Sequence, residues 1–481
     1  MKPEINYKMM IIAAIAGVAL WYVPTPEGLA DNAWHLFGIF VFVIMGIIVK
    51  AAPMGTMAML GIALCAFSLV LAPADSKNPA ADSITAALSG FGNSIIWLIG
   101  MAFFIARGFI KTGLGARIAY FLVSKLGKTT LGLAYGLNFA DLLLAPAVPS
   151  NTARSGGIIY PLMKSAAMNL GSDPAKPETH KKVGSFLTLS TYNANLITST
   201  MFLTGTASNP MAQHFAEELG IKITWGNWAL GALVPGLLCM LLMPWVLYKV
   251  SPPELKNTGD APKAAAQTLK EMGPPKREEW IMVGVFFLLL ILWVFGELFR
   301  IDATTAALLG LCILLLSKVL TWEDVKAEKG AWDTVVWFSS LVMMASYLAK
   351  LGFIPWLSEN IKNAIGGLSW YWAFPIIVLI YFYIHYMFAS ATAHVAAMYF
   401  ALLSVGVAVG VPPLLLALFL GYCGGIFGTL THYGHGPAPI LFGSGYVDIN
   451  SWWKDGFILS LLYLFVFFVI GGAWWKVLGY W

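Results

Sequence analysis

Three short polar side chains and one guanidinium lie together inside strongly apolar sequence. Ser150, Asn151 and Thr152 follow Pro149, and Arg154 comes two residues later. Ser, Asn and Thr are preferred N-cap residues, and a proline keeps the residue before it out of the helical region. We therefore expect one helix to end and another to begin here. The free N–H groups and the dipole of the second helix would attract an anion.

A second polar segment repeats the first one. "SNTAR" (150–154) begins 53 residues after Trp97, and "SATAH" (390–394) begins 53 residues after Trp337. The two tryptophans lie in similar stretches, "NSIIWLIGMAFF" and "DTVVWFSSLVMM". Apolar helices often look alike, but an equal spacing to a second polar segment is rare by chance. The sequence therefore predicts an inverted repeat of the kind found in secondary transporters.

Two further apolar spans are interrupted by polar residues. "LTGTASNPM" interrupts the span that begins near residue 184, and "THYGHGP" interrupts the span that begins near residue 412. Broken helices expose carbonyl and amide groups that can bind a cation or a substrate. The candidate binding residues in these two segments are Thr204, Thr206, Asn209, Thr431, His432, His435, Gly436 and Pro437.

The composition is that of an integral membrane protein. Of 481 residues, 59% are hydrophobic and only 11% are charged, and the mean hydropathy is +0.75. About a quarter of the residues in a soluble domain are charged. The lysines and arginines fall on one side of the predicted spans, which places the N-terminus in the cytoplasm of a bacterial inner membrane. A net charge of +5 gives no indication of nucleic-acid binding.

The predicted organisation is an all-α, inverted-repeat membrane fold with about 11 transmembrane helices, two re-entrant hairpins and two broken helices. The first repeat covers residues 1–250, with a hairpin at about 130–170 and a broken helix at about 184–217. Residues 251–279 form a cytoplasmic linker rich in Pro, Gly and charged residues. The second repeat covers 280–481, with a hairpin at about 370–410 and a broken helix at about 412–443.

"PSNTAR", its degenerate second copy, the threonine-rich break at 204–210 and the later "FGSGY" resemble the divalent anion:sodium symporter family. The likeness is greatest to its bacterial citrate/succinate/tartrate antiporters and plastid 2-oxoglutarate/malate translocators. It implies a homodimer in lipid that moves succinate, malate, fumarate, tartrate, 2-oxoglutarate or citrate by an elevator motion. It also implies that both tips hold the substrate carboxylates: Ser150, Asn151 and Thr152 match one tip, and Ser390 and Thr392 match the other.

The second tip departs from the family pattern because Ala391 replaces the asparagine, and "THYGHGP" replaces a short Thr-Pro-Pro-Asn. A sodium ion needs several oxygen ligands, so we expect at most a residual sodium site, near Ser150, Asn151 and Thr204, and no cofactor. Arg154 and His394 occupy equivalent positions in the two repeats. If they are fixed cations, the empty carrier holds an uncompensated positive charge at membrane depth, and only exchange of anions is expected.

Other interpretations remain open. Arg154 could form a structural ion pair with Asp141, and His385 is expected to be a packing residue. A sodium- or proton-coupled symporter is the alternative to an exchanger, and an anion channel would lack coupling to a counter-substrate. An intramembrane enzyme would need a nucleophile with an oriented base. The sequence has no Gly-x-Ser-x-Gly or His-Glu-x-x-His motif, so we predict that the protein is not an enzyme.

Overall fold

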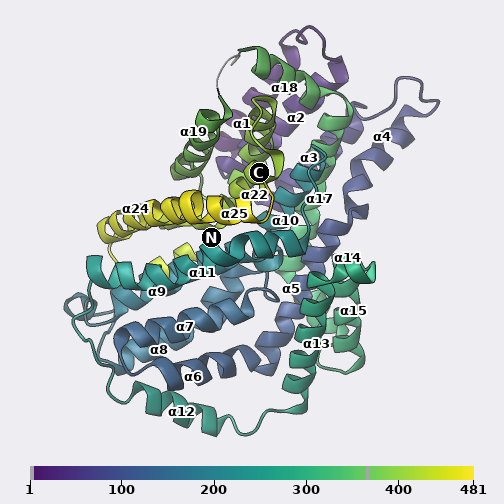
Figure 1. The fold of residues 1–481 in the computed structure, drawn as a ribbon. Coiled ribbons are helices and arrows are strands. Elements are labelled where there is room, and N and C mark those ends of the chain that lie inside the picture. The colour runs from purple at the N-terminus through teal and green to yellow at the C-terminus, as the bar shows by residue number, and fades with distance from the viewer. Residues whose placement is uncertain (1–4, 365–368) are drawn as a thin grey trace.

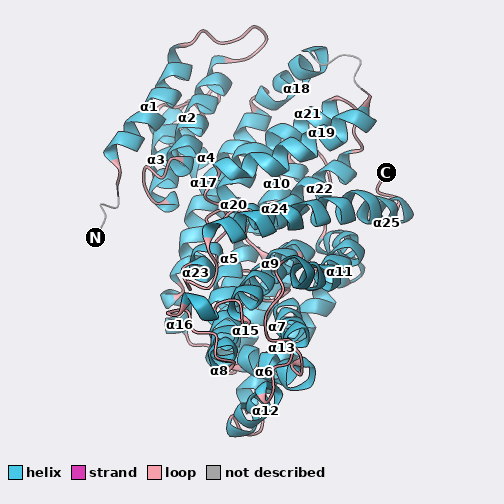
Figure 2. Ribbon diagram, turned by 90° about the vertical axis from the view of Figure 1, so that its left-hand side faces the viewer, coloured by secondary structure: helices cyan, strands magenta, loops and turns pink. Residues whose placement is uncertain are grey.

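The computed structural model describes residues 5–364 and 369–481. Every secondary-structure element assigned in these two ranges is a helix. Within them, seven helical segments are long and apolar enough to cross a membrane, and four shorter helices are also apolar. The prediction of an all-α membrane fold is confirmed. In both views the molecule is elongated, with α6, α8 and α12 at one end and α18 at the other (Figures 1 and 2).

Before the linker, the described residues form the α-helices α1 (Tyr7–Tyr22), α2 (Asp31–Ile48), α3 (Met54–Phe67), α4 (Pro79–Leu88), α5 (Ser94–Thr112), α6 (Leu114–Leu126), α7 (Thr130–Leu144), α8 (Tyr160–Asn169), α9 (Gly184–Met201), α10 (Ser208–Glu217) and α11 (Trp225–Val250). The part after the linker contains α13 (Arg277–Val294), α14 (Gly296–Phe299), α15 (Ala303–Leu316), α16 (Trp322–Ala327), α17 (Lys329–Lys350), α18 (Phe353–Ala364), α19 (Trp370–Tyr383), α20 (Ala391–His394), α21 (Phe400–Ala408), α22 (Pro413–Ile426), α23 (Ala438–Phe442), α24 (Ile449–Phe465) and α25 (Gly472–Val477).

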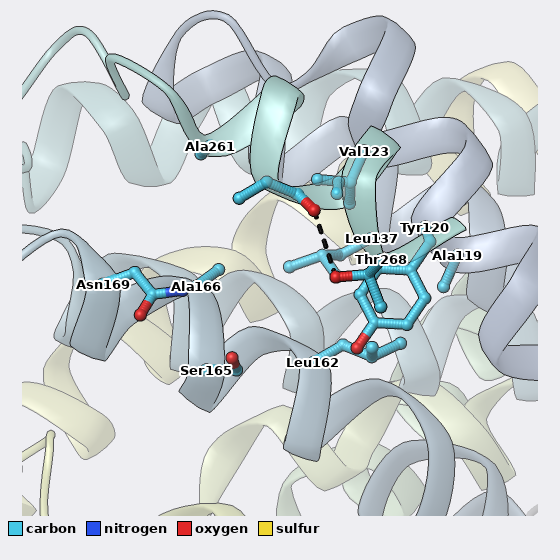
Figure 3. A pocket seen from close by; sticks show the side chains of 12 residues that line it. Ala119, Tyr120, Val123, Leu137, Leu162, Ser165, Ala166, Asn169, Ala261 and Thr268 are labelled. Carbon is cyan, nitrogen blue, oxygen red and sulfur yellow. Dashed lines mark hydrogen bonds between the residues drawn. The ribbon is translucent and has the colours of Figure 1, made fainter. Parts of the chain in front are cut away.

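The linker carries a helix of its own, α12 (Ala261–Glu271), which packs along α6 (Figure 1). Side chains of α6, α7, α8 and α12 line a small cavity of about 70 Å³ between them (Figure 3). Before α12, the amide of Thr130 donates to the Lys256 carbonyl at 2.9 Å. After α12, Arg117 of α6 forms a buried ion pair with Glu279. Most charged residues of the linker are exposed, whereas Glu279 is buried, and these contacts attach both ends of the linker to the neighbouring helices.

Both polar tips have the same backbone form. The chain turns after α7, and re-enters a helix through a wide, π-helical turn, Ala153–Ile159, that leads into α8. After α19 the chain turns again, and α20 continues through a second π-helical turn, Val395–Tyr399, into α21. Such wide turns are rare within helices and are frequently found at functional sites. A third one, Val466–Gly471, lies near the C-terminus. The two tips therefore share a backbone irregularity as well as a sequence pattern.

The two interrupted helices lie at the centre of the fold. Six residues, 202–207, separate α9 from α10, and Thr206 among them is fully extended, with φ −156° and ψ 156°. α22 and the short turn after it end at Leu430, and Thr431 is also extended, with φ −138° and ψ 154°. α9 and α22 pack against each other, and nearly all of their side chains are buried. Both breaks therefore place free backbone groups deep inside the molecule.

Candidate substrate-binding site

Each tip begins its helix with a serine cap. The hydroxyl of Ser150 accepts a hydrogen bond from the Ala153 amide at 3.1 Å, and that of Ser390 accepts one from the Ala393 amide at 3.3 Å. The amide four residues after each serine donates to the serine carbonyl, at 2.8 Å in the first tip and 3.0 Å in the second. The predicted cap at each tip is therefore present, with the same hydrogen bonds in both halves.

The two tips meet around one cavity of about 200 Å³. Both tips, both helix breaks and a wall from α3, α5 and α17 contribute to its lining: Met54, Phe103, Pro149, Ser150, Asn151, Thr152, Thr206, Ala207, Thr334, Trp337, Ser390, Ala391, Thr392, His435 and Gly436. Eight of the predicted binding residues are in this set. They come from four segments that are far apart in the sequence, and the fold brings them together.

The wall of the cavity was not predicted. Met54, Phe103, Thr334 and Trp337 lie in long apolar stretches, where no polar pattern distinguishes them from lipid-facing or core residues. Of these four residues, only Trp337 was used in the sequence analysis, where the second tip was found 53 residues after it. This wall is mostly apolar, with Thr334 as its polar member, whereas the tips opposite it are polar, so the cavity has one polar side and one mostly apolar side.

The first tip is in contact with the break in the other half of the chain. Asn151 Nδ2 lies 2.7 Å from His435 Nδ1, and Asn151 Oδ1 accepts the Thr152 amide at 2.8 Å. A Cβ on Gly436 would lie 2.3 Å from Thr152 Oγ1, so only glycine lets the two segments approach this closely. His435 and Gly436 therefore hold the first tip in place while they line the cavity.

Arg154 is fully buried and does not line the cavity. Its Nε lies 3.1 Å from both carboxylate oxygens of Asp141, which is the ion pair that the sequence left open. Its other N–H groups donate to Val148 O (2.6 Å), Gly205 O (3.2 Å), Thr198 Oγ1 (3.2 Å) and Ser199 Oγ (2.8 Å). The expected uncompensated cation is therefore wrong: Asp141 cancels the charge, and all five donors are occupied.

His394 is also fully buried and absent from the cavity lining. Its Nδ1 lies 3.0 Å from Nδ1 of His385, and its ring stacks on Phe388 with ring centroids 4.4 Å apart. His385 was expected to be a packing residue, and its ring does stack on Phe427 at 3.8 Å. It also forms a polar pair with His394 that sequence reasoning missed, because nothing in "IHYMFASATAH" shows that the two rings meet.

Five other candidates lie outside the cavity lining. The Thr204 hydroxyl donates to Pro146 O at 2.6 Å, and Asn209 Nδ2 donates to Ser199 O at 2.7 Å, so both fasten the first break. Thr431 is buried with an unpartnered hydroxyl. His432 accepts a hydrogen bond from Trp453 at 3.1 Å, on the far side of the second break. Pro437 caps α23. In the part of the chain that the structure describes, no cluster of His, Cys, Asp and Glu could hold a metal ion.

A family described as "Sodium:sulfate symporter transmembrane region" matches residues 4–481. The "Putative malate transporter YflS" of Bacillus subtilis is 53% identical over 98% of this chain and 96% of its own length. "Dicarboxylate transporter 1, chloroplastic" of Spinacia oleracea is 45% identical over 99% of this chain and 82% of its own length. "Inner membrane protein YbhI" of Escherichia coli is 39% identical over 99% and 98%.

Two solved transporters have a similar fold. YdaH of Alcanivorax borkumensis matches with a TM-score of 0.58 over 92% of this chain and 98% of its own. MtrF of Neisseria gonorrhoeae matches with a TM-score of 0.57 over 90% and 97%. Each is 13% identical to this chain, so the likeness concerns the fold alone.

Proposed function

Because this chain belongs to the sodium:sulfate symporter family, the divalent anion:sodium symporters, we propose that it carries small dicarboxylates across a membrane. It is a membrane-spanning transport protein and not an enzyme, because it belongs to a family of transporters and its relatives are named as transporters. Its relatives include one named as a putative malate transporter and two named as chloroplastic dicarboxylate transporters, which supports dicarboxylates as substrates here.

The observation that carries this proposal is the pairing of two equivalent polar tips across one cavity. An extended dicarboxylate has a negative group at each end and a short apolar middle. Ser150, Asn151 and Thr152 would hold one carboxylate, and Ser390 and Thr392 would hold the other. Hydroxyl and amide groups at a helix start can bind an anion without a buried lysine. A third carboxylate, as in citrate, would face the apolar wall, so we expect dicarboxylates to bind more tightly.

We further propose that transport is an exchange that does not need sodium. Arg154 occupies a cage of two carbonyl, two hydroxyl and two carboxylate oxygens behind the first tip, and oxygens of this kind are what a hard cation would bind. The guanidinium therefore takes the place of a mobile ion at this position. Sodium- or proton-coupled symport is the alternative that the experiment below would reveal.

The mechanism proposed for this exchange is an elevator motion in a homodimer. The tips and breaks form the binding side of the cavity, and the separate wall from α3, α5 and α17 forms the other side. Sliding of the binding side along this wall would carry a bound anion across the membrane. We place the protein in a bacterial inner membrane with a cytoplasmic N-terminus, in agreement with the distribution of lysine and arginine.

Uptake into proteoliposomes tests the proposal. Labelled succinate is supplied in sodium-free buffer to vesicles that contain either no substrate or unlabelled malate. We expect rapid uptake only with internal malate, at the same rate when sodium is added. Ser150→Ala is the matched variant, and it should raise the KM for succinate.

Uptake into empty vesicles that requires external sodium would establish a symporter and contradict the role given to Arg154. Uptake into empty vesicles that follows a proton gradient would establish the proton-coupled alternative. No uptake of succinate, malate or 2-oxoglutarate under any of these conditions would contradict the proposed substrate class.

A further inference from the structure

Two fully buried histidines lie directly behind the second tip and have no counterpart behind the first. His385 and His394 are both 0% exposed, and their Nδ1 atoms lie 3.0 Å apart. Their rings are nearly parallel, with an interplanar angle of 12° and centroids 5.2 Å apart. Two lone pairs repel each other, so one Nδ1 must carry a hydrogen that it donates to the other.

The surroundings of this pair contain titratable groups but no fixed charge. Tyr381 from α19 lies against His394 with ring centroids 4.6 Å apart, and it in turn faces Cys423 of α22 and Tyr399. His435 lies close enough to His385 to interact electrostatically. Among the described residues, no Asp, Glu, Lys or Arg forms a hydrogen bond or ion pair with either ring.

Several polar atoms around the pair lack a hydrogen-bond partner in the described protein. They are Nε2 of His385, Nε2 of His394, the Tyr381 hydroxyl and the Thr431 hydroxyl. Buried polar groups are normally satisfied, so such a group of exceptions calls for an explanation. A Cβ on Gly434 would lie 2.4 Å from His385 Nε2 and 2.6 Å from Thr431 Oγ1, so these two atoms face the same glycine.

Aromatic rings that stack on the two histidines favour a positive charge on the pair. Phe427 stacks on both histidines, at 3.8 Å from His385 and 4.7 Å from His394, and Phe388 stacks on His394. The face of an aromatic ring attracts a cation, and more strongly where water is excluded. Histidine is the side chain whose ordinary titration lies nearest physiological pH. The pair can therefore hold one extra proton, on the Nε2 of the ring that donates its Nδ1 hydrogen.

We propose that the His385–His394 pair is a proton-binding site coupled to the dicarboxylate site, a step that rests on the proposed function. His394 lies one helical turn after Ser390, and Thr392 between them lines the cavity. A dianion in the cavity would bring two negative charges to the tip that leads into His394, and these charges favour a positive pair behind the tip. A proton moves from water to the free Nε2 of the ring that donates through Nδ1, and the pair changes from neutral to singly positive. The bound carrier thus holds the dianion and one proton.

Linkage makes the coupling reciprocal, so the affinity for substrate must depend on pH. The protonated pair binds the dianion more tightly. Affinity therefore falls as pH rises above the pKa of the free pair, by up to about tenfold for each pH unit if one proton is taken up. Between pH 7 and 9 both carboxyl groups of succinate are ionised, so the ligand itself contributes little to this change.

Calorimetry of succinate binding tests the proposal on the purified full-length protein in sodium-free buffer. Titrations in phosphate, HEPES and Tris, whose ionisation enthalpies differ, give the number of protons taken up for each succinate bound. We expect about one proton near pH 7.5 for the unmodified protein. His385→Phe keeps the stack on Phe427 but removes the shared hydrogen bond, and His394→Asn removes a titrating ring. Both should bind succinate with little or no proton uptake.

His35→Gln is the matched control, because His35 of α2 stacks on Trp21 of α1 and has no part in the pair. It should take up the same number of protons as the unmodified protein. A binding heat that is the same in all three buffers would overturn the proton site and leave the dicarboxylate site standing. Full proton uptake in both His385→Phe and His394→Asn would also overturn it. No binding of succinate or malate at all would overturn the proposed function, and the linked proton with it.

Discussion

The two tips share a backbone but differ in what supports them from behind. Each begins with a capping serine and continues through a π-helical turn. Behind the first tip lies the Arg154–Asp141 ion pair, with every guanidinium N–H in a hydrogen bond. Behind the second lies the His385–His394 pair, with both Nε2 atoms unpartnered. The Arg154–Asp141 pair has all its guanidinium hydrogen bonds formed and keeps its charge, whereas the His385–His394 pair can take up a proton.

Equivalent positions show how this difference is encoded. Asp141 lies nine residues before Ser150, and Tyr381 lies nine residues before Ser390. The position that holds a carboxylate in the first repeat therefore holds a neutral phenol in the second. With no anion at that position, a permanent cation at residue 394 would be buried without a partner, which is very costly. The chain has histidine there, which can be neutral. We infer that the first tip is held rigid while the second responds to the substrate.

Removal of the carboxylate behind the first tip should have the largest effect. Asp141→Asn leaves a buried guanidinium without its counter-charge, and loss of one partner of a buried ion pair typically costs about 3–5 kcal/mol. We expect a marked fall in the thermal unfolding midpoint in detergent, together with loss of exchange. The double variant Asp141→Leu/Arg154→Met should recover much of the stability. An unchanged midpoint in Asp141→Asn would show that the ion pair does not hold the first tip.

Adding a methyl group beside each tip should show that the two tips have different roles. Gly436→Ala would press on Thr152 Oγ1 from 2.3 Å, whereas Gly434→Ala would press on His385 Nε2 from 2.4 Å. Overpacking of this kind costs about 1–3 kcal/mol. We expect Gly436→Ala to weaken succinate binding at every pH, and Gly434→Ala to alter mainly its pH dependence. Binding titrations at pH 6.5 and 8.5 compare them, and identical profiles would argue against different roles for the two tips.

Loss of either capping serine should have a moderate and similar effect. Ser150→Ala and Ser390→Ala each remove an N-cap, which costs about 1 kcal/mol, and a hydroxyl that would contact a carboxylate. We expect the KM for succinate in exchange assays to rise by about fivefold or more in each. Thr25→Ala, at an exposed hydrogen bond far along the chain from both tips, serves as the control. A large effect in only one serine variant would mean that a single tip binds the substrate.

The smallest effect is expected at the position equivalent to Asp141. Tyr381→Phe removes a hydroxyl that has no hydrogen-bond partner in the described protein, so no interaction is lost. We expect the stability to change by less than about 0.5 kcal/mol. The thermal unfolding midpoints of Tyr381→Phe and Asp141→Asn, measured under the same conditions, compare the two equivalent positions directly. A large loss in Tyr381→Phe would show that the hydroxyl supports the second tip.

Much of the fold and of the site could be predicted from the sequence. Hydropathy and turn chemistry are local properties, so the serine caps and the two breaks are visible in short stretches of residues. The equal spacing from Trp97 to Ser150 and from Trp337 to Ser390 links the two halves. These features were enough to bring eight candidate residues to one cavity.

The side-chain partners could not be predicted, because they depend on which faces of distant helices meet. Asn151 contacts His435, which lies far along the chain in the other half. His432 belongs to the same polar break, yet its ring faces away from the cavity towards Trp453. Arg154 was expected to face the substrate, and the burial of Asp141 beside it determines that it does not. The polarity of a residue indicates that it needs a partner, not which partner it has.

Electron cryo-microscopy of the protein with malate in sodium-free buffer tests the central claim most directly. Our account predicts density for malate between the tips, with one carboxylate at Ser150, Asn151 and Thr152 and the other at Ser390 and Thr392. Arg154 should remain paired with Asp141 in that structure. Malate bound at one tip only, or in direct contact with an Arg154 released from Asp141, would contradict the account.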